Sequence, residues 1–237
     1  MTKERRHEVV SGLQKEILVH TSTNLSLSSL QAALIVAIVD YGAGNLHAFW
    51  NGIAVCKRVG THLGLLDLVS NNGDNYNKIS SVPPRMLALP HTVIEQEERI
   101  RAFWMTEVLD NVSTLGTGWN LSVSPVESHA LLPCNEIVWA FPERTVDGSS
   151  PLNLECSSLL SLYVTLVTRS LAKVHESLRQ EFDHSSLAHQ TQQQERCMAL
   201  DTSLEEWRQS KEVVETLSSH SPTHDPLYVL INATLHM

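Results

Sequence analysis

The chain has 237 residues, of which 42% are hydrophobic and 18% charged, a composition typical of a globular protein with its own core. Its formal net charge of −9 argues against direct DNA binding, because nucleic-acid affinity depends on lysine and arginine neutralising phosphates. Residues 1–8 are charged where a secretory signal would be apolar, and no run of about 18 apolar residues follows, so the sequence predicts no membrane partner.

The first two predicted helices lie within residues 3–41. Residues 3–19 form an amphipathic pattern, with apolar side chains at three- and four-residue steps: Val10, Leu13 and Ile17. Residues 20–26 supply several Ser, Thr and Asn side chains that can cap a following helix. The next apolar stripe runs over residues 27–41, including Ile38 and Tyr41, and covers nearly all sides near its end. We therefore expect this second helix to lie deep in the core.

A glycine-containing turn at residues 42–45 separates the second helix from a third, whose apolar face runs over residues 49–63. Gly64 suits the left-handed conformation that ends many helices. A turn this short favours an antiparallel helix pair. Residues 70–90 are rich in Asn, Gly and Pro, which predicts a surface loop.

The strongest helical pattern follows that loop. Thr92 stands three residues before Glu95, the spacing of a reciprocal helix cap, and Gly116 marks the expected helix end. Charged residues occupy the front of this segment, and its apolar residues recur with helical spacing: Ile100, Phe103, Trp104, Val108, Val112 and Leu115. This period predicts a buried helix.

The second half of the chain begins with an irregular passage over residues 116–150. Ser150-Pro151 suits a helix start, and the apolar spacing predicts the longest helix of the chain up to Leu178. Residues 183–194 are predicted to be a solvated helix extension or a loop. Two further helices are expected, one around residues 197–207 and one over residues 225–235.

Candidate catalytic and metal-binding groups do not form a known arrangement. Adjacent residues on a helix point about 100° apart, so Glu97 and Glu98 cannot flank one bond as an acid–base pair. The remaining candidates lack the companions that their chemistry needs: His184 with His189, His220 with His224, the Gly116-x-Gly118 pattern, and Cys134 as a nucleophile. We assign no catalytic, metal-binding or DNA-binding residue.

The four cysteines are Cys56, Cys134, Cys156 and Cys197, with no C-x-x-C pair among them. This scatter matches neither a zinc site nor a disulfide framework, so we expect a reduced, intracellular protein without a cofactor.

Two motifs, which occur in the same order along the chain as in the family, resemble the middle homology region of fungal zinc-cluster transcription factors. The first is a Leu-Gln helix at residues 30–34, followed by a Gly-containing turn, Trp50 and a Leu-Gly-Leu ending at residues 63–65. The second places basic residues before Phe-Trp, then Leu-Asp, a glycine and a proline-ended loop: Arg99, Arg101, Phe103, Trp104, Asp110, Gly116 and Pro133. The resemblance implies structural roles for these seven residues. Family members continue Leu-Asp-Arg where this chain has Asn111, so the salt bridge of that arginine is not expected here.

The resemblance implies an all-α fold, an irregular multi-helix bundle with long surface loops. We expect an N-terminal helix and linker at residues 1–26 and a regulatory domain at residues 27–237 that is truncated at its C-terminus. The zinc cluster of the family needs six cysteines, which this chain does not supply. The implied function is therefore a nuclear, non-enzymatic transcription regulator of a metabolic or secondary-metabolite gene set. It is expected to contact other regulators or the transcription machinery and to reach DNA only through a separate domain.

A different reading from the same residues is a helical module that binds a small molecule or another protein and has no role at DNA. In this alternative a pocket lies between helices around Trp104 and Tyr163. A small-molecule effector is also a candidate partner for a transcription regulator.

Overall fold

The computed structural model describes residues 3–70, 86–114, 130–140, 158–178, 183, 185–220 and 225–235. Helices dominate these ranges and no strand occurs in them, which confirms the predicted all-α class. The chain folds into two compact units. Of the described residues, 3–113 and 130–132 belong to unit 1, and Thr114 and those from Pro133 onward belong to unit 2.

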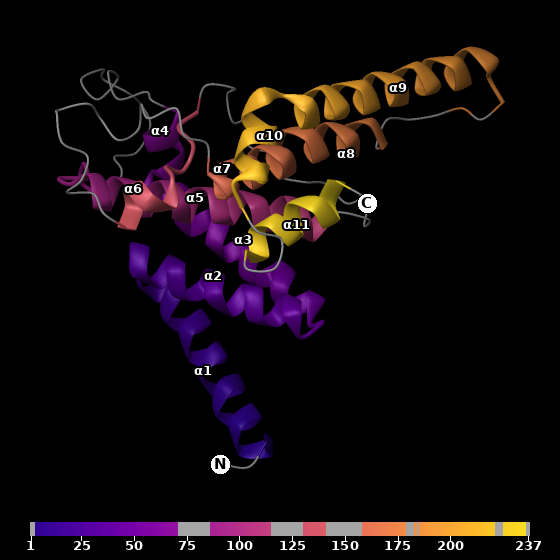
Figure 1. Cartoon of the computed structure of the whole chain (residues 1–237). Helices are drawn as coiled ribbons and strands as arrows, with labels where there is room; N and C mark the ends of the chain where they lie inside the picture. The colour runs from indigo at the N-terminus through magenta and orange to yellow at the C-terminus, as the bar shows by residue number, and fades with distance from the viewer. Residues whose placement is uncertain are drawn as a thin grey trace, which may run out of the picture. The chain divides into compact units, whose positions relative to one another are not determined.

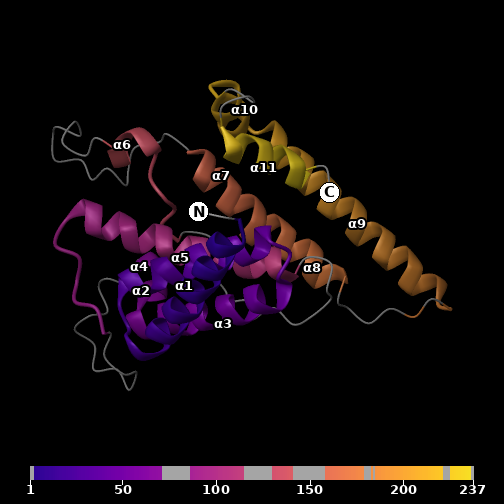
Figure 2. The same cartoon turned by 90° about the horizontal axis from the view of Figure 1, so that it is seen from below.

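Unit 1 contains five helices in its described residues: α1 (Lys3–Thr23), α2 (Leu27–Gly42), α3 (Leu46–Leu63), α4 (Leu65–Val69) and α5 (Val93–Thr114). Figure 1 shows α1 extending away from the body of unit 1, with the N-terminus at its outer end. Figure 2, seen from below, looks nearly along α1 onto the group formed by α2, α3 and α5.

Local capping fixes the ends of these helices. Ser26, from the predicted Ser/Thr/Asn-rich break, accepts a hydrogen bond from the Ser29 backbone N–H at 3.1 Å and caps α2. Gly44 and Gly64 both have positive φ, of 74° and 76°, which glycine adopts without strain. Gly64 ends α3 in the left-handed conformation, as its position predicts.

The core of unit 1 forms where α2 packs on α3. A Cβ on Gly52 would lie 3.8 Å from the Ala37 Cβ, so the two helices are already in van der Waals contact there. Leu30, Phe49 and Ile53 are among the least exposed side chains of this core. The helical periods of residues 27–41 and 49–63 therefore correctly predict two helices that pack against each other.

One expectation about α2 is wrong. Its C-terminal half does not lie deep in the core, because Ile35, Ile38, Val39 and Tyr41 are exposed. Only one face of α2 is covered, and it is lined by Leu30, Ala33, Leu34 and Ala37. An apolar surface that extends all round a helix does not indicate which side its neighbours cover.

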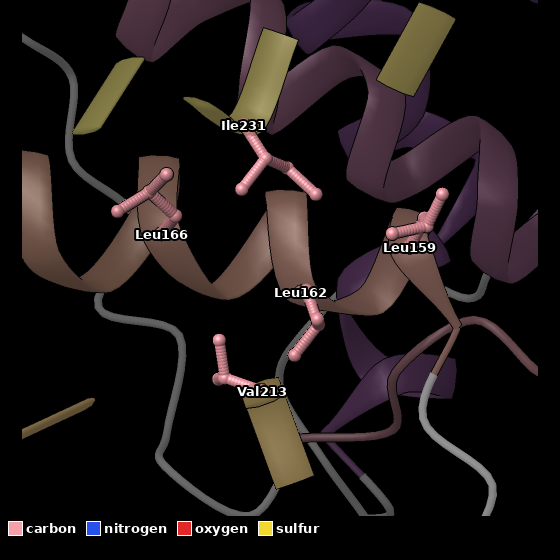
Figure 3. Packing of buried hydrophobic residues seen from close by; sticks show 5 residues of the cluster. All are labelled: Leu159, Leu162, Leu166, Val213 and Ile231. Carbon is pink, nitrogen blue, oxygen red and sulfur yellow. The ribbon is translucent and has the colours of Figure 1, made fainter. Parts of the chain in front are cut away.

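Unit 2 is also helical. Its described elements are α6 (Glu136–Ala140), α7 (Leu159–Thr165), the π-helix η4 (Leu166–Leu171), α8 (Ala172–Leu178), α9 (Leu187–Gln209), α10 (Lys211–Ser218) and α11 (Pro226–Leu235). Figure 3 shows its core, where Leu159, Leu162 and Leu166 of α7 and η4 meet Val213 and Ile231. Segments that are about 70 residues apart in the chain thus share one apolar cluster.

The helix boundaries in unit 2 differ from the prediction in two places. The helix expected to begin after Ser150 begins after Ser158, which forms a reciprocal cap with Ser161 at 2.9 and 3.0 Å; residues 151–157 lie outside the described ranges. The longest described helix is α9, with 23 residues, and it starts inside the passage predicted as helix extension or loop. None of its residues is buried.

Candidate functional site

The motif helix α5 begins with a cap that holds the preceding loop. The Thr92 Oγ1 accepts a hydrogen bond from the Glu95 N–H at 3.1 Å, as predicted. The Glu95 carboxylate accepts from the His91 N–H at 2.9 Å, one residue before the position that a reciprocal cap would use. This contact lowers the pKa of Glu95, and the charge of Arg99 adds to the effect.

Arg99 and Arg101 form ion pairs along α5. The buried Arg99 guanidinium donates to the Glu95 carboxylate and to the carbonyl of Ala88 in the preceding loop. The Arg101 Nε donates to the Glu97 Oε1 at 2.7 Å, although Glu97 is only 1% exposed. Both arginines therefore fasten carboxylates within their own helix, and Arg99 also fixes the loop before it.

The aromatic pair lies at the centre of unit 1. Phe103 and Trp104 are buried, and their rings meet nearly edge to face with centroids 5.2 Å apart. The Trp104 Nε1 donates to the carbonyl of Leu131 at 2.6 Å, and the Leu131 N–H donates to the carbonyl of Val69 at 2.9 Å. The backbone of Leu131 thus links α4 to α5. We call residues 130–132 the strap.

Lys57 of α3 joins two carboxylates of α5. Its Nζ lies 2.6 Å from the Asp110 Oδ2 and 3.5 Å from the Glu107 Oε2. The Asn111 side chain, at the position where the family carries arginine, donates to the Glu107 carbonyl at 2.8 Å. Asp110 therefore has Lys57 as its salt-bridge partner. Sequence reasoning did not identify Lys57, although its place four residues after Ile53 puts it beside the buried stripe of its helix.

Burial raises the pKa of Glu107, because removal from water outweighs the attraction of Lys57, and the charge of Asp110 adds to the increase. A small cavity of about 30 Å³ lies beside this carboxylate, roughly the room that one water molecule needs. Lys57, Phe103 and Thr106 line the same cavity.

We expect Glu107→Gln to gain stability relative to the wild type as the pH rises from about 4.5 towards neutrality. The folded state of the wild type binds the Glu107 proton more tightly than the unfolded state does, so its free energy of unfolding falls as pH rises between the two pKa values. Urea unfolding of unit 1 at several pH values measures the difference. Glu8→Gln, at an exposed position of α1, is the control and should show no such trend. A pH-independent difference for Glu107→Gln would contradict the expectation.

The other motif residues have different positions. Pro133, which follows the strap in the chain, is buried and belongs to unit 2. Gly116 lies outside the described residues, while α5 ends at Thr114, shortly before it. The structural roles that the resemblance implies for these seven residues stay a prediction, to which the geometry adds particular contacts for Arg99, Arg101, Trp104 and Asp110.

The groups considered for catalysis or metal binding are placed as follows. Glu97 pairs with Arg101, the ring nitrogen Nδ1 of His220 lies 2.7 Å from the Thr216 carbonyl oxygen, and the Cys134 thiol contacts the Asn135 carbonyl. His184, His224 and Gly118 lie outside the described residues. In the part of the chain that the structure describes, no three His, Cys, Asp or Glu side chains are grouped so that they could hold a metal ion.

Two further observations concern binding and membranes. A groove of about 410 Å³ lies between α1 and α2, but its lining includes neither Trp104 nor Tyr163, the residues around which a small-molecule pocket was predicted. These two residues lie in different units, so that pocket stays a prediction. Across the described ranges, no helix combines the length and apolar character needed to cross a bilayer.

Cys56 and Cys197 have contrasting environments. Cys56 is buried in α3, and burial raises the pKa of its thiol to about 12, whereas Cys197 is exposed on α9. Because the thiolate is the reactive form, we expect iodoacetamide to modify Cys197 and spare Cys56 in the native protein at pH 8. Peptide mass spectrometry measures the two extents, and both should be modified in urea. Equal native reactivity would show that Cys56 is not held in the core.

Comparison with known proteins identifies the family. Residues 2–209 match the fungal specific transcription factor domain. The chain is 30% identical over 206 residues to a protein of Aspergillus versicolor described as "Notoamide biosynthesis cluster transcriptional coactivator notQ'". The alignment covers 87% of this chain and 40% of the relative, so the chain spans less than half of that protein's length. No solved structure matches the chain. The family match confirms the resemblance seen in the two ordered motifs: this chain belongs to the fungal specific transcription factor domain family.

Proposed function

We propose that this chain regulates transcription of a biosynthetic gene set, as a coactivator-like protein that works through contacts with other proteins. The observation that carries the proposal is the family match over residues 2–209. The relative from Aspergillus versicolor, described as a cluster transcriptional coactivator, supports both the coactivator role and the link to a biosynthetic cluster.

The geometry of α5 supports a role in holding a scaffold together. Its arginines pair with carboxylates, its aromatic rings are buried, and its two C-terminal carboxylates pair with Lys57 of α3. These contacts stabilise unit 1 from within and leave the outer faces of α1 and α2 for contacts with other molecules. We also propose that the protein is not an enzyme.

The proposed partners are regulators or components of the transcription machinery in the nucleus. A net charge of −9 favours protein partners over the phosphate backbone, so DNA is reached through a separate domain or protein. A small-molecule effector stays a prediction. Thermal-shift screening against metabolites tests it, because a ligand that binds only the folded state raises the unfolding midpoint.

A tethering experiment tests the proposed function. The chain is fused to a heterologous DNA-binding domain, and expression of a reporter gene with the matching binding site is measured in a fungal host. We expect the fusion to change reporter output relative to the DNA-binding domain alone. Trp104→Ala, which we expect to destabilise unit 1, is the matched control and should weaken the effect at equal protein level. Reporter output that neither rises nor falls relative to the DNA-binding domain alone would count against the proposal.

A further inference from the structure

We draw no further inference here: the strongest candidate, the partly apolar groove of about 410 Å³ between α1 and α2, carries nothing, because no contact that the structure describes shows what covers it.

Discussion

Trp104→Ala is expected to destabilise unit 1 by about 3–5 kcal/mol, the range found when a buried aromatic side chain is removed from a core. Trp104 is 1% exposed and packs edge to face against Phe103, so its loss leaves a cavity that the helices cannot readily fill. The substitution also removes the hydrogen bond that holds the Leu131 carbonyl, and with it one of the two contacts that fix the strap. Urea unfolding followed by circular dichroism measures the loss.

Two controls separate these contributions. Trp104→Phe keeps most of the ring volume but lacks the indole N–H, so it should cost less than Trp104→Ala and should still increase hydrogen exchange at Leu131. Ile35→Ala removes an apolar side chain that is 63% exposed and should change the free energy of unfolding little. If Trp104→Ala and Ile35→Ala had similar effects, Trp104 would not be the core residue that the structure shows.

The second large effect is expected for Lys57→Met, which should destabilise unit 1 by about 3 kcal/mol, the lower end of the range for breaking a buried ion pair. The substitution keeps most of the length of the side chain but leaves Glu107 and Asp110 of α5 facing each other without the cation between them. Their side chains are 7% and 15% exposed, so little water can replace the lost partner. Chemical unfolding at neutral pH measures the effect.

The triple variant Lys57→Met, Glu107→Gln, Asp110→Asn tests the explanation. If the cost arises from two carboxylates without a cation, neutralising them should recover most of the lost stability. Lowering the pH towards 4.5 should have the same effect on Lys57→Met, because protonation of Glu107 removes one charge. A triple variant as unstable as Lys57→Met would show that Lys57 contributes by packing and not by its charge.

The sequence predicts the elements of unit 1 well because their apolar residues repeat with one clear helical period. Phe103 and Trp104 fall on the buried side of α5, Thr92 caps it, and Gly64 ends α3. For the motif residues, an arginine at the start of a helix can reach carboxylates or the carbonyl ends of neighbouring helices. The structure shows a carboxylate partner for Arg99, Glu95, but its carbonyl partner, Ala88, lies in the preceding loop and not at a helix end.

Other features could not be predicted because they depend on residues far apart in the chain. Periodicity cannot pair Lys57 with Asp110, which are 53 residues apart, or Trp104 with the Leu131 carbonyl. The exposure of Ile35 and Val39 follows from which neighbours cover α2, and that information is not contained in α2 itself. The start of α9 could have been predicted from Ser186, which caps the helix. The composition of α9 is polar, however, so no apolar stripe indicates where the helix runs.

The π-helix η4 has a consequence for changes in chain length. Leu159, Leu162 and Leu166 keep α-helical spacing, which would continue at Ser170, yet the next leucine is Leu171, one position later. The wide turn of a π-helix takes up that surplus residue, so α7 and α8 both keep their packed sides. Deleting Ser170 would convert this turn to an ordinary α-helix and leave both sides in register, whereas a deletion at Ser161 would rotate everything after it by about 100°. Insertions and deletions in this helix should therefore be tolerated in evolution only between Leu166 and Leu171.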